Sequence, residues 1–261
     1  MREVSGKGEN VKGPGSLDHS LEAAAERAIA TFDVERARME YWNQNECVYL
    51  ERFLPPALVE SVLVPEVQRL RSEVHRAFIP GHKKSGSVSY FTLREKAPLF
   101  LQLYRAQAFI DFLSRLTNAR LLPCPDSDPH ACALYYYTEP GDHMGFHYDT
   151  SYYKGARYTI LLGLIQRSQS CRLLCQLYKD DQEREMRELQ LSYGPGDLVI
   201  FNGNKLWHGV SPLEAGGERV VLTMEYVTNP AMAFHKRLFS NLKDAFAYFG
   251  LSAVFRPRRR Q

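Results

Sequence analysis

The hydrophobic pattern changes from helical to strand-like at about residue 120, and this change constrains the fold more than any other feature. Before it, apolar residues recur at the spacing of a helix face; after it, short apolar or alternating runs are separated by Gly, Pro and charged turns. These runs cover residues 130–138, 143–153, 157–164, 172–178, 189–193, 198–201 and 220–227. Helices followed by many short strands predict a mainly β fold with an α layer, an antiparallel double-sheet barrel.

The same patterns divide the chain. We expect a flexible arm over residues 1–16 and one domain over 17–250, with a helical part at about 17–118, a strand core at about 120–228 and a C-terminal helix at about 234–250. Residues 251–261 are expected to form a basic tail. In the helical part, helices are predicted from 16, over 58–78 with a break at Pro65, and over 98–118, and strands over 47–50 and 87–92. The turn at 139–142 predicts a hairpin between the strands on either side.

Charge and composition exclude several classes of function. The formal net charge is +3, but four arginines of the tail (Arg256, Arg258, Arg259 and Arg260) account for the excess, and the rest of the chain is close to neutral. The body therefore lacks the basic surface that nonspecific nucleic-acid or membrane binding requires. No apolar run approaches the roughly 18 residues of a membrane span, and the start has no secretory signal, so a cytoplasmic protein is predicted. The five cysteines suggest no disulfide framework. The sequence does not indicate whether the protein is a monomer or an oligomer.

His147 and Asp149 are the residues most indicative of chemistry. They lie two apart on a predicted strand, so their side chains point to the same face. His208, on a later predicted strand, completes a set of two imidazoles and one carboxylate. This donor set holds Fe(II) as a facial triad and leaves coordination positions open for a cosubstrate and oxygen. Arg219, at the start of the last strand, is suited to binding a distal carboxylate of an anionic cosubstrate.

These residues carry a resemblance to a known family. Residues 49–227, with the run at 86–90 and the segments FHYDTSYYKGARYT and FNGNKLWHGV, resemble an Fe(II)/2-oxoglutarate-dependent oxygenase with a double-stranded β-helix (jelly-roll or cupin-like) core flanked by N-terminal helices. They are most similar to the branch of small amino-acid halogenases and their hydroxylase relatives. The resemblance implies that His147, Asp149 and His208 bind iron and are catalytic, that Arg219 binds the C5 carboxylate of 2-oxoglutarate, and that O2 is consumed.

This chain differs from some members of the resembled family at two positions, and each difference implies a further expectation. Many relatives place Ser or Thr two residues after the arginine, where this chain has Val221, so the second cosubstrate contact is assigned to Thr159, Tyr136 or another strand residue. Halogenating relatives replace the carboxylate ligand with Gly or Ala to admit chloride, whereas this chain keeps Asp149. The resemblance therefore implies hydroxylation of an unactivated C–H bond with release of succinate and CO2, or desaturation or ring closure.

The expected substrate is a free amino acid or a similar small metabolite. Lys84, or its neighbour Lys83, is a candidate for the substrate carboxylate, and Glu225 and Asn229 are candidates for an amine. Further candidates to line the substrate site are His143, Met144, Thr150 and Tyr153. Two alternatives stay open: an oxygenase acting on a carrier-tethered or protein substrate, and a jelly-roll binding protein without turnover.

Overall fold

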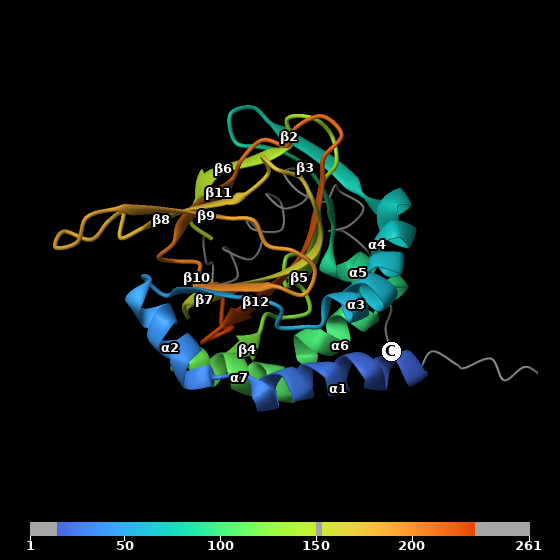
Figure 1. Ribbon diagram of the computed structural model, residues 1–261, viewed down its shortest axis with the longest axis horizontal. Coiled ribbons are helices and arrows are strands. Elements are labelled where there is room, and N and C mark those ends of the chain that lie inside the picture. The colour runs from blue at the N-terminus through green and yellow to red at the C-terminus, as the bar shows by residue number, and fades with distance from the viewer. Residues whose placement is uncertain (1–14, 150–152, 233–261) are drawn as a thin grey trace, which may run out of the picture.

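The computed structural model describes residues 15–149 and 153–232 (Figure 1). Its helices are α1 (Gly15–Thr31), α2 (Val34–Asn43), α3 (Pro56–Leu58), the π-helix η1 (Val59–Leu63), α4 (Val64–Arg69), the 3-10 helix η2 (Leu70–Glu73), α5 (Tyr90–Lys96), α6 (Leu99–Arg105) and α7 (Gln107–Thr117). Its strands are β1 (Cys47–Leu50), β2 (His75–Ile79), β3 (Lys83–Val88), β4 (Leu122–Pro123), β5 (Cys132–Tyr137), β6 (His143–His147), β7 (Arg157–Arg167), β8 (Leu173–Leu177), β9 (Arg187–Leu191), β10 (Leu198–Asn202), β11 (Trp207–Val210) and β12 (Glu218–Val227).

The strands form one curled antiparallel sheet in the order β1-β10-β7-β12-β5-β3-β6-β11-β8-β9, with β2 on β3 and β4 on β12. The sheet folds over so that β10, β7, β12 and β5 face β6, β11 and β8 across the interior (Figure 1). This arrangement confirms the predicted double-stranded β-helix core. Most predicted strands lie within two residues of their observed bounds.

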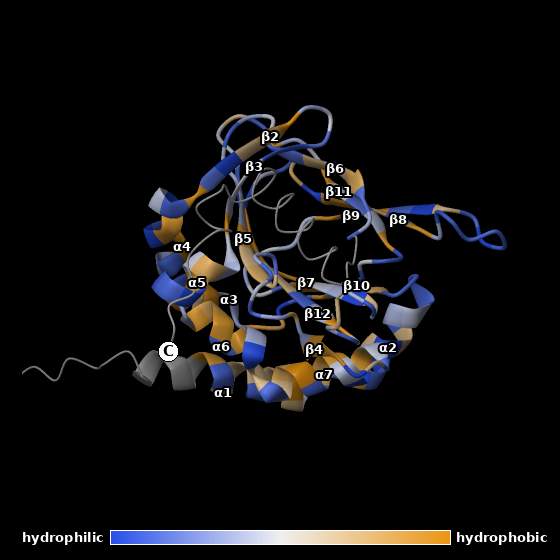
Figure 2. Ribbon diagram, turned by 180° about the vertical axis from the view of Figure 1, so that it is seen from behind, coloured by the Kyte–Doolittle hydropathy of each residue, from blue (hydrophilic) through white to orange (hydrophobic). Residues whose placement is uncertain are grey.

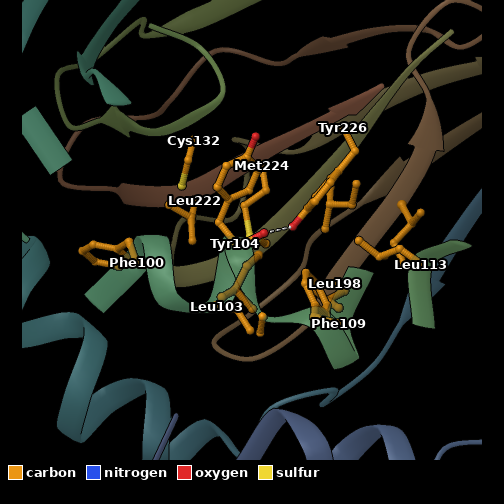
Figure 3. Packing of buried hydrophobic residues seen from close by; sticks show 14 of the residues in the cluster. Phe100, Leu103, Tyr104, Phe109, Leu113, Cys132, Leu198, Leu222, Met224 and Tyr226 are labelled. Carbon is orange, nitrogen blue, oxygen red and sulfur yellow. Dashed lines mark hydrogen bonds between the residues drawn. The ribbon is translucent and has the colours of Figure 1, made fainter. Parts of the chain in front are cut away.

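The N-terminal helices cover the outer face of the β10-β7-β12-β5 side. Figure 2 shows that α6 and α7 are predominantly hydrophobic, whereas the end of the projecting β8–β9 hairpin is hydrophilic. Phe109 and Leu113 of α7 are fully buried in the main core. Tyr104 of α6 ties this layer to the sheet, because its hydroxyl donates to the Glu225 carbonyl (3.0 Å) and its own carbonyl accepts from the Tyr226 hydroxyl (2.6 Å; Figure 3). The helix layer thus fixes the part of β12 that carries Glu225.

Three local predictions are wrong. Residues 75–78, predicted as the end of a helix, belong to β2 (75–79), because pairing with β3 overrides a local helical pattern. Residues 90–92, predicted as strand, begin α5, whose N-cap is Ser89. The predicted hairpin does not form, because β3 lies between β5 and β6 and pairs with both. A turn signal fixes the reversal of the chain, but not which strand fills the space beside it.

Other predictions fall beyond the described part of the chain. The C-terminal helix at 234–250, the basic tail and Thr150 lie outside the described residues, as does the arm as far as residue 14; α1 begins at Gly15. In the described ranges, no helix has both the length and the hydropathy needed to cross a membrane. All five cysteines are buried and free of disulfides.

Asp142, fully buried in the turn before β6, provides a test of the sheet framework. Its carboxylate accepts from the backbone N–H groups of Thr138 and Glu139 (2.9 and 3.0 Å) and pairs with both terminal nitrogens of Arg76 (2.5 and 2.8 Å). We expect Asp142→Ala to lower the free energy of unfolding in urea by about 2–3 kcal/mol, because a half-buried guanidinium and two backbone N–H groups lose their partner. Glu139→Ala is the control: the 55% exposed Glu139 also contacts Arg76, and its loss should cost under about 1 kcal/mol. Equal effects would contradict this account.

Candidate metal centre and cavity

The structure brings His147, Asp149 and His208 together. His147 ends β6 and lies directly opposite His208 of β11 in the antiparallel register, and Asp149 follows β6 by two residues. One ligand atom from each lies within 4.8 Å of the others. Asp149 Oδ1 is 3.5 Å from His147 Nε2 and 3.8 Å from His208 Nε2. This is the one grouping of at least three His, Cys, Asp or Glu side chains in residues 15–149 and 153–232 that is compact enough to hold a metal ion.

Backbone carbonyls orient both imidazoles. Nδ1 of His147 lies 2.8 Å from the Gly145 carbonyl, and Nδ1 of His208 lies 3.0 Å from the Leu206 carbonyl. Each Nδ1 therefore donates to its carbonyl, which leaves Nε2 as the nitrogen that is available beside Asp149 for a metal ion. Burial lowers the pKa of His208, so this imidazole is neutral, as a metal ligand must be.

Asp149 is held as a buried carboxylate. Burial opposes ionisation, but the imidazoles of His208 and His147 and the Arg157 guanidinium hold the pKa of Asp149 well below its usual range. Its backbone N–H donates to the Gly203 carbonyl at 2.9 Å. A Cβ at Gly203 would lie 2.7 Å from the Asp149 Cβ, so the turn after β10 must have glycine at this position. Gly203, absent from the sequence prediction, is thus a positioning residue.

The metal-binding group opens into a cavity of about 310 Å³ between the two sides of the sheet. Arg219 is 2% exposed and lies on the wall formed by β12. Its guanidinium donates to the Tyr193 hydroxyl and lies 5.0 Å from the centre of the Tyr137 ring. In the described chain, no carboxylate lies within ion-pair distance of Arg219. A buried guanidinium that faces a cavity without an anionic partner is suited to binding the carboxylate of a ligand.

The two candidates for the second cosubstrate contact lie in different places. Thr159 lines the cavity, and its hydroxyl is 2.5 Å from Asp149 Oδ2 and 3.0 Å from Glu225 Oε2. Tyr136 points away from the cavity, and its hydroxyl donates to the Val67 carbonyl at 2.9 Å. The assignment of Tyr136 is therefore corrected. Side chains alternate along β5, so its neighbours Tyr135 and Tyr137 line the cavity instead.

Because side chains alternate along a strand, only some of the predicted substrate residues face the cavity. Met144 lines the cavity, but His143 points outward and contacts the Gly141 carbonyl at 2.8 Å. Lys84, opposite His143, donates to the Pro140 carbonyl at 2.8 Å outside the cavity. The assignments of Lys84 and His143 are thus corrected, because both lie on the outer face of their strands. Lys83, opposite Met144, is the buried lysine, with Nζ 5.2 Å from the centre of the Tyr135 ring.

Tyr153 also lies outside the lining of the cavity. It is buried, and its hydroxyl donates to Asp128 Oδ2 at 2.8 Å, outside the cavity lining. It therefore supports the Asp128 loop and does not contact the cavity, which corrects its assignment as a lining residue.

Arg157 is a cavity residue that sequence reasoning missed, and it pairs with Glu225. Arg157 Nε is 2.9 Å from Glu225 Oε2, and both side chains are almost completely buried and line the cavity. Burial raises the pKa of Glu225, and the adjacent Arg157 guanidinium opposes that shift by favouring the ionised carboxylate. Arg157 lies two residues before Thr159 on β7, and Glu225 lies six residues after Arg219 on β12, so each shares the strand parity of a residue that the sequence analysis assigned to the site. This parity is the signal that could have identified Arg157.

Thr159→Val tests what the Thr159 hydroxyl does. We expect the affinity for Co(II), a spectroscopic substitute for Fe(II), to fall about tenfold, because a partner that orients a ligating carboxylate is lost. Thr159→Ser should retain the affinity, since it keeps the hydroxyl. A weaker affinity for 2-oxoglutarate with unchanged Co(II) binding would instead support the cosubstrate contact predicted from the sequence.

Comparisons with known proteins identify the fold. No protein-family profile matches the sequence, and no curated protein does. Among solved structures, the carbocyclase SnoK from nogalamycin biosynthesis superposes with a TM-score of 0.60 at 12% identity, over 78% of this chain and 88% of that one. The epimerase SnoN gives 0.59 at 13% identity, over 74% and 82%. Both are described as α-ketoglutarate-dependent, and SnoN has been crystallised with Fe3+ and α-ketoglutarate.

A prolyl hydroxylase from Trichoplax adhaerens, in complex with a peptide, matches over 88% of this chain and 98% of its own, with a TM-score of 0.57 and 14% identity. The fold is that of the Fe(II)/2-oxoglutarate-dependent oxygenases. At these identities the likeness concerns the fold alone, and the chemistry must be argued from the residues of the cavity.

Proposed function

We propose that this protein is an Fe(II)/2-oxoglutarate-dependent oxygenase that hydroxylates an unactivated C–H bond of a free amino acid or a similar small metabolite, with release of succinate and CO2. The observation that carries the proposal is the presence, in one cavity, of two oriented imidazoles, one ionised carboxylate and the buried Arg219 guanidinium. A binding protein without turnover would not need this combination of groups.

The donor set fits Fe(II). Two imidazole nitrogens and one carboxylate oxygen, without a thiolate, match the ligands of non-haem ferrous sites. His147 Nε2, His208 Nε2 and Asp149 Oδ1 would hold the ion. When bound together with 2-oxoglutarate, the iron would activate O2 for attack on a C–H bond.

Arg219 would bind the distal carboxylate of 2-oxoglutarate. The aromatic rings of Tyr137 and Tyr193, 5.0 and 4.9 Å from its guanidinium carbon, exclude water around it, and the Tyr193 hydroxyl orients it. Low local polarity strengthens the charge pair that the ligand would form. Glu225 lies at the opposite end of the wall formed by β12, which leaves the region around Arg157 for the substrate.

Asp149 supports hydroxylation over halogenation. It occupies the position at which chloride would need an open coordination site, and Thr159 and Gly203 hold it there. Structural neighbours with this fold include an epimerase, a carbocyclase and a prolyl hydroxylase, so desaturation or ring closure are the alternatives within the same chemistry. The cavity volume of about 310 Å³ is at the lower end for small-molecule sites, which favours a small substrate beside the cosubstrate.

The test is a turnover assay. We expect the full chain, supplied with Fe(II), 2-oxoglutarate and O2, to form succinate in response to at least one of the amino acids, with a product heavier by one oxygen by mass spectrometry. A chlorinated product would contradict the role of Asp149. Anaerobic addition of Fe(II) and 2-oxoglutarate should also give a weak visible charge-transfer band. A protein that shows the band but no turnover with any small molecule would point to a larger substrate or to a binding function.

A further inference from the structure

Arg157 and Glu225 lie at the end of the cavity wall remote from Arg219, in the region left for the substrate, and the proposed function gives neither side chain a role. Arg219, Val221, Thr223 and Glu225 line the same wall along β12. At about 3.3 Å per residue, Glu225 is roughly 20 Å along the strand from Arg219. Arg219, which we propose binds the cosubstrate, and the Arg157–Glu225 pair therefore lie at different ends of the cavity wall.

Each member of this buried pair has hydrogen-bonding capacity left over. Glu225 uses Oε2 for both of its contacts, with Arg157 Nε at 2.9 Å and with the Thr159 hydroxyl at 3.0 Å. In residues 15–149 and 153–232, Oε1 of Glu225 and the two terminal nitrogens of Arg157 form no hydrogen bond. Burying a charged group destabilises the protein when some of its hydrogen-bonding atoms have no partner, unless a ligand or water supplies one.

The charges nearby favour a ligand that includes a cation. Asp128 lies on the loop before β5, and its negative charge raises the pKa of Arg157. Its carboxylate oxygens accept hydrogen bonds from the Tyr153 hydroxyl and the His130 backbone N–H. Asp128 and Glu225 thus both favour the charged form of this guanidinium, and Glu225 is the one in ion-pair contact with it. A ligand with both an ammonium and a carboxylate would complement this end of the cavity, because it supplies a partner for each unsatisfied group.

We propose that Arg157 and Glu225 form the site that recognises the head group of an amino acid substrate: the ammonium donates to Glu225 Oε1, and the carboxylate accepts from the two terminal nitrogens of Arg157. The inference rests on the proposed function, to which it adds the residues that determine specificity. Because the Thr159 hydroxyl lies between Glu225 and Asp149, the head group binds one side chain away from the metal ligands.

The test measures binding. The twenty L-amino acids are titrated by calorimetry into the full chain loaded with Fe(II) and 2-oxoglutarate without oxygen, and the tightest binder is compared with its N-acetyl derivative and its carboxamide. We expect each blocked form to bind at least about tenfold more weakly, as for loss of a charge-assisted hydrogen bond. Glu225→Gln should remove the preference for the free amine and keep the preference for the carboxylate. Arg157→Gln should do the reverse.

The controls separate this inference from misfolding and from failure of the proposed function. Melting temperature and 2-oxoglutarate affinity are measured for every variant, and the double variant of Arg157 and Glu225 removes both charges so that neither is left buried alone. Glu46→Gln, which alters a buried carboxylate paired with Lys205 outside the cavity, should leave both preferences intact. Unchanged preferences in Glu225→Gln, or no binding by any amino acid despite normal 2-oxoglutarate affinity, would overturn the inference. Failure of the wild type to bind 2-oxoglutarate would overturn the proposed function instead.

Discussion

Asp149→Ala is expected to abolish substrate-dependent succinate formation and to reduce Co(II) affinity by more than about a hundredfold. Loss of a partner that merely orients a metal ligand costs 10–100-fold, and loss of the ligand itself should cost more. The carboxylate is also the only negative group among the three ligands, so the variant presents two neutral imidazoles to a divalent cation. Calorimetric Co(II) titration and a succinate assay measure the two effects.

Asp126→Ala is the matched control, because Asp126 is 63% exposed, pairs with Arg105 and lies outside the cavity. It should leave both quantities within twofold of the wild type. If Asp149→Ala kept wild-type metal affinity, the assignment of this group as the metal centre would be wrong. A normal melting temperature is required of both variants, so that loss of binding is not loss of fold.

Arg219→Met should raise the KM for 2-oxoglutarate by about a hundredfold or more. A buried charge pair between ligand and protein is worth about 2–5 kcal/mol, and 2.7 kcal/mol corresponds to a factor of one hundred. Methionine keeps much of the volume between Tyr137 and Tyr193, so the cavity wall should stay packed. The kcat at saturating 2-oxoglutarate should fall much less, because the interaction is made equally in the ground state.

The specificity for the cosubstrate gives a sharper readout of the same site. 2-Oxopentanoate has a methyl group in place of the distal carboxylate, so the wild type should strongly prefer 2-oxoglutarate, and Arg219→Met should lose most of that preference. Tyr193→Phe should produce a smaller loss, since it removes only the hydroxyl that orients the guanidinium. An unchanged preference in Arg219→Met would place the distal carboxylate elsewhere.

Local patterns predicted most of the strands because residues that alternate in polarity or form short apolar runs have few other stable arrangements in a globular core. They failed where pairing between distant segments decided the outcome. Residues 75–79 became a strand through β3, and β3 itself separated the two strands expected to form a hairpin. Strand order depends on which edges meet after the chain has collapsed, and no local signal encodes that.

The sequence by itself determined the donor set. A spacing of two in a predicted strand indicated that His147 and Asp149 share one face, and they do come together although β6 ends at His147; the residue types specify the metal chemistry. The tertiary structure decided which side chains face the cavity. It turned Tyr136 outward and Tyr137 inward, buried Lys83 instead of Lys84, and paired Arg157 of β7 with Glu225 of β12. The physical reason is that one residue of register reverses the facing of a whole strand, and register is fixed by packing and hydrogen bonds between segments far apart in the chain.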